Sequence, residues 1–377
     1  MTSSVLTNDF VKLWNQIASA AHEALERVGQ SGQVILGNEV ASFEREIAQR
    51  TSRLHGIGVA NGLEAIEIAL VAAGLKPGDG VITTPMSAFA TTLAIVRAQG
   101  VPIFVDVDKE GLIDLSLVPV AVGSHPHARF IVPVHLYGFP LNLADLKEVC
   151  LRHKLVCVED CAQALGATWN DEVVGSVGCS AALSFYPTKN LGALGDAGAI
   201  VTSDHRMNEC IRSLRDYGQT GKYKHDLLGY NSRLDEVHAA ILLTALLPSL
   251  DKWTGRRREI AHAYLSGIQN HHIRIPTPPR ESNPVWHLFP VLVHQPLRDE
   301  FRSFLSQRNI MTGVHYPFLA CDQPAMRDIR FGTVGSLTNA RRFAAEQVSL
   351  PIHPFLTDEE IEHVVTEVNS WNPVQGS

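Results

Sequence analysis

Short apolar runs alternate with longer segments of helical periodicity through the first two thirds of the chain. The runs are rich in β-branched residues and lie at 81–84, 103–105, 130–134 and 155–158. The segments between them are long enough to hold crossover helices. Residues 180–202 add two predicted strands around a glycine-rich loop. This alternation predicts a mostly parallel β-sheet that helices cover on both faces.

Helical patterns flank these strands. Leu63, Ile66, Leu70 and Ala73 fall on one face of a predicted helix that follows Gly62 and ends at Gly74. Residues 10–28 form an amphipathic pattern, and we expect this helix to pack beside the later domain or a partner subunit.

The pattern of hydrophobic and polar positions changes after about residue 250. A polar helix is predicted at 251–267, and short mixed strands and two late helices at 297–308 and 357–369 follow it. A length of 377 residues also favours about two domains. We therefore predict a large domain at 1–250, which includes the N-terminal helix, and a smaller C-terminal α/β domain at 251–377.

Composition and charge exclude several classes of function. The net charge is −7 without any run of five like charges, which argues against nucleic acid and anionic membranes as partners. No signal-like or membrane-spanning segment is apparent. The six cysteines are too scattered for a disulfide framework, and Cys157 and Cys161 lack the second pair that a zinc site needs. We expect a cytoplasmic protein with reduced cysteines and no metal.

The candidate chemistry centres on a lysine and a carboxylate. Asp160 follows a buried strand, so it lies at the carboxyl end of the predicted sheet, where open α/β folds bind ligands. Lys189 lies between a strand and a glycine-rich loop, where partial desolvation lowers the pKa of its amine. A Schiff-base lysine and a carboxylate for the ring nitrogen are what pyridoxal phosphate requires. Gln163 is placed to reach the phenolic oxygen of the ring. Taken singly, Asp160 is better explained as a helix N-cap and Lys189 as a solvated surface residue, so the prediction rests on their combination with Gln163, Ser184 and Gly62.

A phosphate site is predicted where a strand gives way to a helix. Gly62 opens that helix, so free backbone N–H groups and the helix dipole point at any bound anion. Ser184, five residues before Lys189, adds a hydroxyl. Taken alone, Gly62 is also compatible with a purely structural turn.

Four strings give the chain a recognisable resemblance. They are VANGLEA at 59–65, VEDCAQA at 158–164, SFYPTKNLG at 184–192 and GYNSRLDE at 229–236. With matches from residue 31 to residue 354, the chain resembles the nucleotide-sugar aminotransferases of the DegT/StrS group. In sequence, residues 61–65 and 231–236 are more similar to enzymes that aminate C3 of a dTDP-3-oxo-6-deoxyhexose than to those that act at C4.

The resemblance implies a fold-type I enzyme that uses pyridoxal phosphate and works as a homodimer with active sites between the subunits. Lys189 is then expected to carry the cofactor and move protons. Asp160 and Gln163 would hold the ring nitrogen and the phenolic oxygen, and Phe89 would stack on the ring. The phosphate would be held by the backbone of Gly62 and Leu63, the Ser184 hydroxyl and Asn231 of the partner subunit. L-glutamate or L-glutamine is the implied amino donor and a keto sugar on a nucleotide the acceptor.

Some positions depart from the family pattern. Leu63 occupies a position where the family often has threonine. The hydroxyl contact to the phosphate is therefore lost, and only the backbone can bind the phosphate at this position. His315 and Tyr316 match a sugar-side loop that diverges after Pro317, and they join Arg233 as candidate substrate contacts. A C4-keto nucleotide sugar or a cyclitol is the alternative acceptor. A non-catalytic regulator that keeps the fold is the alternative function.

Structural interpretations are favoured for several other side chains. We predict that His135 is a core histidine, that Trp286 and His287 pack within the small domain, and that Arg256, Arg257 and Arg258 form a solvated helix face. For Arg233, an ion pair with Asp235 or Glu236 is as plausible as a substrate contact.

Overall fold

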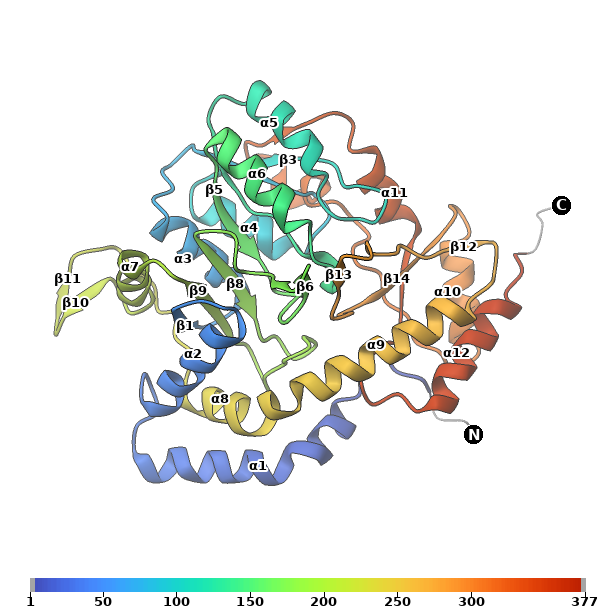
Figure 1. The fold of residues 1–377 in the computed structure, drawn as a ribbon, viewed down its shortest axis with the longest axis horizontal. Helices are drawn as coiled ribbons and strands as arrows, with labels where there is room; N and C mark the ends of the chain where they lie inside the picture. Colours follow the sequence, from blue (N-terminus) through green and yellow to red (C-terminus); the bar gives the residue numbers. More distant parts are fainter. Residues whose placement is uncertain (1–3, 374–377) are drawn as a thin grey trace.

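The computed structural model describes residues 4–373, and its centre is an eight-stranded sheet (Figure 1). The strand order is β1-β9-β8-β5-β4-β2-β3-β15, and every neighbouring pair is parallel except those that β9 makes with β1 and β8. The prediction of a mostly parallel sheet is confirmed. The strands are β1 His55–Val59, β2 Gly80–Thr83, β3 Val101–Phe104, β4 Ala128–Ile131, β5 Val156–Asp160, β8 Ser180–Ser184, β9 Gly198–Thr202 and β15 Gly332–Thr333.

Alternating residues along these strands supply apolar layers on both faces of the sheet. On β8 and β9, Ala182 and Ile200 join a core with helices α3, α4 and α7. Their neighbours Ala181 and Val201 join a second core with α1, α2 and α8. Because both faces of such a strand are buried, its sequence is a continuous run of apolar residues. The helices are α1 Phe10–Ser31, α2 Asn38–Arg50, α3 Gly62–Ala72, α4 Phe89–Arg97, α5 Val118–Ser124, α6 Leu143–His153, α7 His205–Arg215 and α8 Glu236–Ile241.

The last third of the chain builds a smaller antiparallel sheet of order β12-β14-β16. Two other short strands of this part of the chain lie in different sheets. Strand β15 extends the large sheet beside β3, and β13 pairs with β6. The boundary near residue 250 stays a prediction. The elements are α9 Leu250–Gly267, α10 Arg298–Ser306, α11 Thr338–Glu346, α12 Asp358–Ser370, β6 Thr168–Trp169, β7 Glu172–Val173, β12 Ile273–Arg274, β13 Ser282–Asn283, β14 Phe289–Val293 and β16 Gln347–Leu350.

The prediction of a solvated face at 256–258 is wrong for Arg257. Its side chain is buried on the same side of α9 as Trp253 and Ile260, and its Nη1 donates to the carbonyl oxygens of His287 at 3.4 Å and Ile352 at 3.0 Å. Desolvation lowers the pKa of Arg257 to about 10, so the guanidinium stays charged at neutral pH. Arg256 does face outward, where it pairs with Asp358.

A hairpin of β10 Gln219–Gly221 and β11 Lys224–His225 projects from the body of the molecule (Figure 1). Tyr223, in the turn of this hairpin, is 84% exposed, and Leu228, in the segment that follows it, is 99% exposed. Large apolar side chains that are exposed together often mark an interaction surface. Among the helices of residues 4–373, none is long and apolar enough to cross a membrane.

Candidate active site

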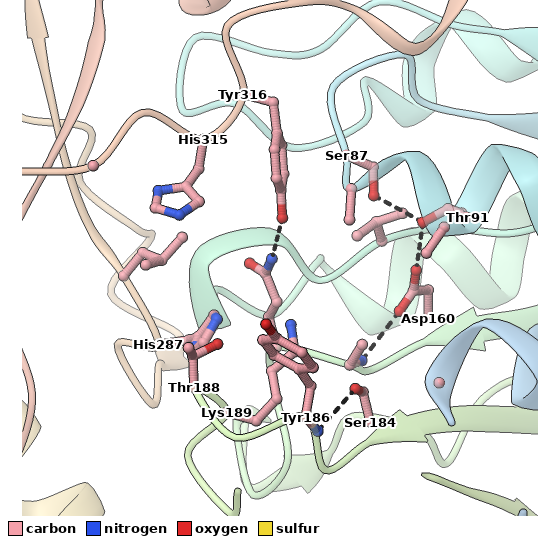
Figure 2. Close-up of a pocket in the computed structure, with 18 of the residues that line it drawn as sticks. Ser87, Thr91, Asp160, Ser184, Tyr186, Thr188, Lys189, His287, His315 and Tyr316 are labelled. Atoms are coloured by element: carbon pink, nitrogen blue, oxygen red, sulfur yellow. Dashed lines mark hydrogen bonds between the residues drawn. The ribbon is translucent and has the colours of Figure 1, made fainter. Parts of the chain in front are cut away.

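A cavity of about 660 Å³ lies at the carboxyl ends of β5 and β8, between the large sheet and the C-terminal third of the chain. Figure 2 shows its two walls: Asp160, Thr91 and Ser87 on one side, and His315 and Tyr316 on the other. The wall from the large sheet includes Asn61, Gly62, Leu63, Ser87, Ala88, Ala90, Thr91, Asp160, Ala162, Gln163, Ser184 and Lys189. The other wall includes His287, Leu288, Thr312, Gly313, His315, Tyr316, Ser349, Leu350 and Ile352.

Asp160 is the last residue of β5, and its carboxylate is buried in the cavity wall. Its Oδ2 accepts a hydrogen bond of 2.8 Å from the Thr91 hydroxyl, and its Oδ1 accepts one of 3.1 Å from the Ala162 N–H. Burial raises the pKa of Asp160, while these two donors and the Lys189 charge oppose the rise. No helix begins at Asp160 within the described chain, so the N-cap alternative is wrong.

Lys189 lies in the loop between β8 and β9, and its amine faces the same cavity. Desolvation lowers the pKa of Lys189 to about 8, although the carboxylate of Asp160 opposes this change. A substantial fraction of the amine is therefore neutral near physiological pH, which is the form that attacks a carbonyl carbon. The alternative of a solvated surface lysine is wrong.

The N-terminus of α3 and Ser184 form an anion cradle next to this pair. Asn61 caps α3 by accepting a hydrogen bond of 2.8 Å from Glu64 N–H, which leaves the first-turn N–H groups of Gly62 and Leu63 without an intrahelical acceptor. A Cβ at position 62 would lie 2.6 Å from the Ser184 Cβ. Glycine is thus required for the helix end and the Ser184 hydroxyl to meet. Phosphate suits this donor set.

The orientation of the Gln163 amide follows from its partners. Its Oε1 accepts a hydrogen bond of 2.7 Å from Tyr137 N–H, so the amide nitrogen must be the end that faces the cavity. That nitrogen donates to the Tyr316 hydroxyl at 3.1 Å and keeps a second hydrogen for an acceptor in the cavity. An oxyanion on an aromatic ring is such an acceptor.

These features together fit pyridoxal phosphate. The cavity offers an anion cradle, a buried carboxylate, an amide donor and an amine of lowered pKa, one for each polar group of that cofactor. The four groups come from segments that lie up to 127 residues apart, from Gly62 to Lys189, and the parallel strands bring them to one edge of the sheet.

The opposite wall carries two residues of the predicted substrate side. His315 shares a hydrogen bond of 2.9 Å between its Nδ1 and the Ser349 hydroxyl, and desolvation together with the Lys189 charge lowers the pKa of His315 to about 4. Burial raises the pKa of Tyr316 to about 12. Both side chains are therefore neutral at physiological pH and offer hydrogen bonds rather than charge.

Phe89, Asn231 and Arg233 are predicted site residues that do not line this cavity. Phe89 begins α4 and packs against the apolar core, and it is not among the cavity-lining residues although Ala88 and Ala90 are. Asn231 is exposed and accepts a hydrogen bond of 2.7 Å from Arg233. The roles of Phe89 and Asn231 stay predictions.

Arg233 pairs with neither of the carboxylates that were considered for it. Its Nη1 lies 2.9 Å from Asp216 Oδ1. Asp235 instead caps α8 and contacts His238, while Glu236 accepts hydrogen bonds from Gly37 and Val40 N–H. The local spacing favours an i, i+2 or i, i+3 pair, but the chain folds so that the residue at the C-terminal end of α7 supplies the partner.

Among the described residues, the buried side chains of His135, Glu159 and Cys161 lie close enough together to be considered as metal ligands. His135 Nδ1 accepts from Leu141 N–H, so its other nitrogen carries the proton and donates to Glu159 at 3.2 Å. Glu159 also accepts from three backbone N–H groups. The cluster is thus satisfied by hydrogen bonds, and His135 is a core histidine as predicted.

Thr91 and His287 are cavity residues that the sequence did not predict. Thr91 belongs to a polar stretch after the carboxyl end of β2, and that position was the available signal. The prediction that Trp286 and His287 pack together in the small domain is wrong for His287. Trp286 does stack on Phe289 with ring centroids 5.2 Å apart, but His287 lines the cavity. Nothing in the local sequence marked it.

Comparison with known proteins adds three findings. Residues 15–369 match the model of the DegT/DnrJ/EryC1/StrS aminotransferase family. A pleiotropic regulatory protein of Geobacillus stearothermophilus is 41% identical over 96% of both chains, and a dTDP-3-amino-3,6-dideoxy-α-D-galactopyranose transaminase of Aneurinibacillus thermoaerophilus is 41% identical over 93% of this chain and 94% of its own. The crystal structure of DesV from S. venezuelae, in complex with a ketimine intermediate, superposes with a TM-score of 0.93 at 39% identity and covers 98% of this chain and 99% of its own.

Proposed function

The chain belongs to the DegT/DnrJ/EryC1/StrS aminotransferase family, and we propose that it moves an amino group from L-glutamate or L-glutamine to the keto carbon of a nucleotide-linked 6-deoxyhexose. Transamination and dependence on pyridoxal phosphate are properties of this family. The observation that carries the proposal is the shared cavity, in which the Lys189 amine, the Asp160 carboxylate and the α3 N-terminus meet.

Pyridoxal phosphate, when bound, supplies an aldehyde for amine exchange and a ring that accepts electrons. Asp160 would hold the ring nitrogen, and its two hydrogen-bond donors fix the position of the carboxylate and favour its charged form. Gln163 would donate to the phenolic oxygen, and Gly62, Leu63 and Ser184 would bind the phosphate. Lys189 would carry the cofactor and move a proton between substrate carbon and cofactor, a role that suits an amine with a pKa of about 8.

The sugar is assigned from the relatives and from the chemistry of the C-terminal wall. The Aneurinibacillus relative is named for an amine at C3 of a dTDP-linked dideoxyhexose, so we propose a dTDP-3-oxo-6-deoxyhexose as acceptor. His315 and Tyr316 are neutral hydrogen-bonding groups on this wall, as a sugar requires. Arg233 would meet a substrate anion, and a C4-keto nucleotide sugar or a cyclitol is the alternative acceptor.

A homodimer is part of the proposal. Asn231 is exposed and does not line the cavity of its own subunit, so it reaches a phosphate only in a second copy. The projecting hairpin and the segment that follows it carry exposed Tyr223 and Leu228, and helix α1 exposes Phe10 and Val11. Apolar surface of this kind is expected at the interface of an isologous dimer. Six unpaired cysteines support a reducing, cytoplasmic location.

A regulatory role without catalysis is the rival function, because one relative is named a pleiotropic regulatory protein. A buried carboxylate of raised pKa and a desolvated amine of lowered pKa both cost stability, which a scaffold without chemistry has no reason to maintain. We therefore favour catalysis.

The proposal is tested with purified protein and a panel of 3-keto and 4-keto nucleotide sugars, each mixed with L-glutamate or L-glutamine and read by mass spectrometry. An amino sugar from a 3-keto dTDP-hexose is the expected product. If the bound cofactor is converted to its amine form but no amino sugar is produced, the assigned acceptor is wrong. If neither amino donor converts the cofactor, the result supports the regulatory alternative.

A further inference from the structure

His287 is held in the cavity wall by contacts to both its backbone and its ring. The segment before it crosses the 137–138 loop, where Val285 N–H donates to the Gly138 carbonyl at 3.0 Å. A Cβ at position 138 would lie 2.8 Å from the His287 nitrogen, so glycine permits this close crossing. Arg257 donates to the His287 carbonyl oxygen from the far side. The preceding residue, Trp286, adopts a φ of 47°, a left-handed conformation that an unconstrained tryptophan avoids.

Asn190 fixes the tautomer of the His287 ring. Its amide nitrogen donates to the Val285 carbonyl at 2.9 Å, so its oxygen is the atom that lies 3.2 Å from His287 Nδ1. An oxygen accepts, and Nδ1 must therefore carry the hydrogen. The Nε2 atom is then an unprotonated acceptor. Burial and the nearby Lys189 and Arg257 charges hold the pKa of His287 far below its usual value, so Nε2 stays unprotonated at neutral pH.

The position of this acceptor decides what it meets. His287 belongs to the wall formed by the C-terminal third, with His315 and Tyr316. In Figure 2 it lies beside Thr188, on the other side of Lys189 from Ser184. Pyridoxal phosphate already finds partners for its polar groups on the other wall. The ligand at His287 is thus the exchanging substrate.

The chemistry of an acceptor selects between the two substrates. An unprotonated Nε2 lone pair attracts O–H and N–H donors and repels carboxylate oxygens. The carboxylates of an amino-acid donor are unsuitable partners and its amine is the group that is transferred, whereas the hydroxyls that flank the keto carbon of a hexose are suitable and do not react. We propose that His287 Nε2 accepts a hydrogen bond from a sugar hydroxyl next to the reacting carbon and so positions that carbon over Lys189. This inference rests on the proposed function.

Two substitutions separate the two nitrogens of the ring. His287→Asn places an amide nitrogen where Nδ1 lies, so it keeps the contact with Asn190 and removes the Nε2 acceptor. His287→Gln reaches the Nε2 position with an amide oxygen. The control is His294→Asn, at a histidine outside the cavity whose side chain is 85% exposed. Cofactor absorbance and thermal unfolding of each holoenzyme report whether the variant folds and keeps its cofactor.

Binding to the holoenzyme is measured by calorimetry with two probes, dTDP-3-amino-3,6-dideoxy-α-D-galactopyranose and dTDP alone, and the glutamate half-reaction is followed by absorbance. For His287→Asn we expect the Kd of the amino-sugar nucleotide to rise about tenfold, as the loss of one buried hydrogen bond would cause. The Kd of dTDP and the glutamate half-reaction should change less than about threefold. His287→Gln should recover most of the lost affinity.

Unchanged affinity of His287→Asn for the amino-sugar nucleotide would overturn the inference. Equal losses for dTDP, or for the glutamate half-reaction, would also overturn it, because a merely structural histidine would act on all three. Wild-type protein that turns over its cofactor with glutamate but binds no amino-sugar nucleotide would instead remove the proposed acceptor, which is a different failure.

Discussion

The Thr91 hydroxyl donates a hydrogen bond of 2.8 Å to Oδ2 of Asp160 at the bottom of the cavity. Thr91 comes from the start of α4 and Asp160 from the end of β5, so the contact joins a helix on one face of the sheet to the carboxyl end of a strand. Burial alone would push the pKa of Asp160 upward, and this donor opposes it. A residue that does not itself titrate therefore favours the charged form of this carboxylate.

Replacing Thr91 with valine tests this relationship. The Asp160 carboxylate would lose a hydrogen bond worth about 1.5–3 kcal/mol, and its pKa would rise further. We expect the glutamate half-reaction to slow by about 10- to 100-fold. Thr91→Ser keeps the hydroxyl and should stay within about threefold of wild type in the same stopped-flow measurement. Equal rates for the valine and serine variants would contradict the role of the contact.

The pH dependence of cofactor loading follows from the lowered pKa of Lys189. Below its pKa of about 8 the amine is mostly protonated, so the rate at which apoenzyme binds pyridoxal phosphate should rise about tenfold per pH unit and level off above pH 8. The Asp160 charge raises the pKa of Lys189. Asp160→Asn should accordingly move the midpoint to lower pH. A midpoint near the ordinary lysine value of 10.5 would show that Lys189 is solvated.

The close approach of Gly62 and Ser184 makes a steric prediction. An alanine methyl group at position 62 would lie 2.6 Å from the Ser184 Cβ, so Gly62→Ala should open the cradle and weaken cofactor binding by at least about tenfold. Ser184→Gly removes the clashing atom, and the double variant should lose less affinity than the two single losses combined. Gly29→Ala, where nothing lies within 4 Å, is the control. Strict additivity of the two losses would contradict the packing argument.

Mixing two inactive variants tests whether the active sites are shared. Lys189→Ala removes the amine, and Asn231→Asp places a negative charge where the phosphate of the neighbouring site is expected. A mixed dimer would then contain one site with both defects and one intact site. Equal co-expression should restore about one quarter of wild-type activity, because about half of the dimers are mixed and each has one working site. Activity no higher than the mean of the two pure variants would show that each subunit supplies its own Asn231.

The sequence predicted the sheet and the cofactor-binding wall because both depend on local patterns. Apolar runs with crossover segments specify parallel strands, and their carboxyl ends bring Gly62, Asp160 and Ser184 together. The other wall depends on contacts between distant segments. Asn190 and His287 meet across 97 residues, and Arg257 and Ile352 across 95. A run of three arginines looks solvated until the helix is packed, so the burial of Arg257 had no local signal.

The most direct test of the account is to trap the bond between protein and cofactor. Holoenzyme is reduced with borohydride, digested, and searched by mass spectrometry for the peptide that carries the pyridoxyl phosphate mass. The account predicts the modification at Lys189 alone, and its absence from both Lys189→Ala and wild-type protein that was first converted with L-glutamate. Modification at another lysine, or none in holoenzyme that absorbs as the aldehyde form, would contradict it.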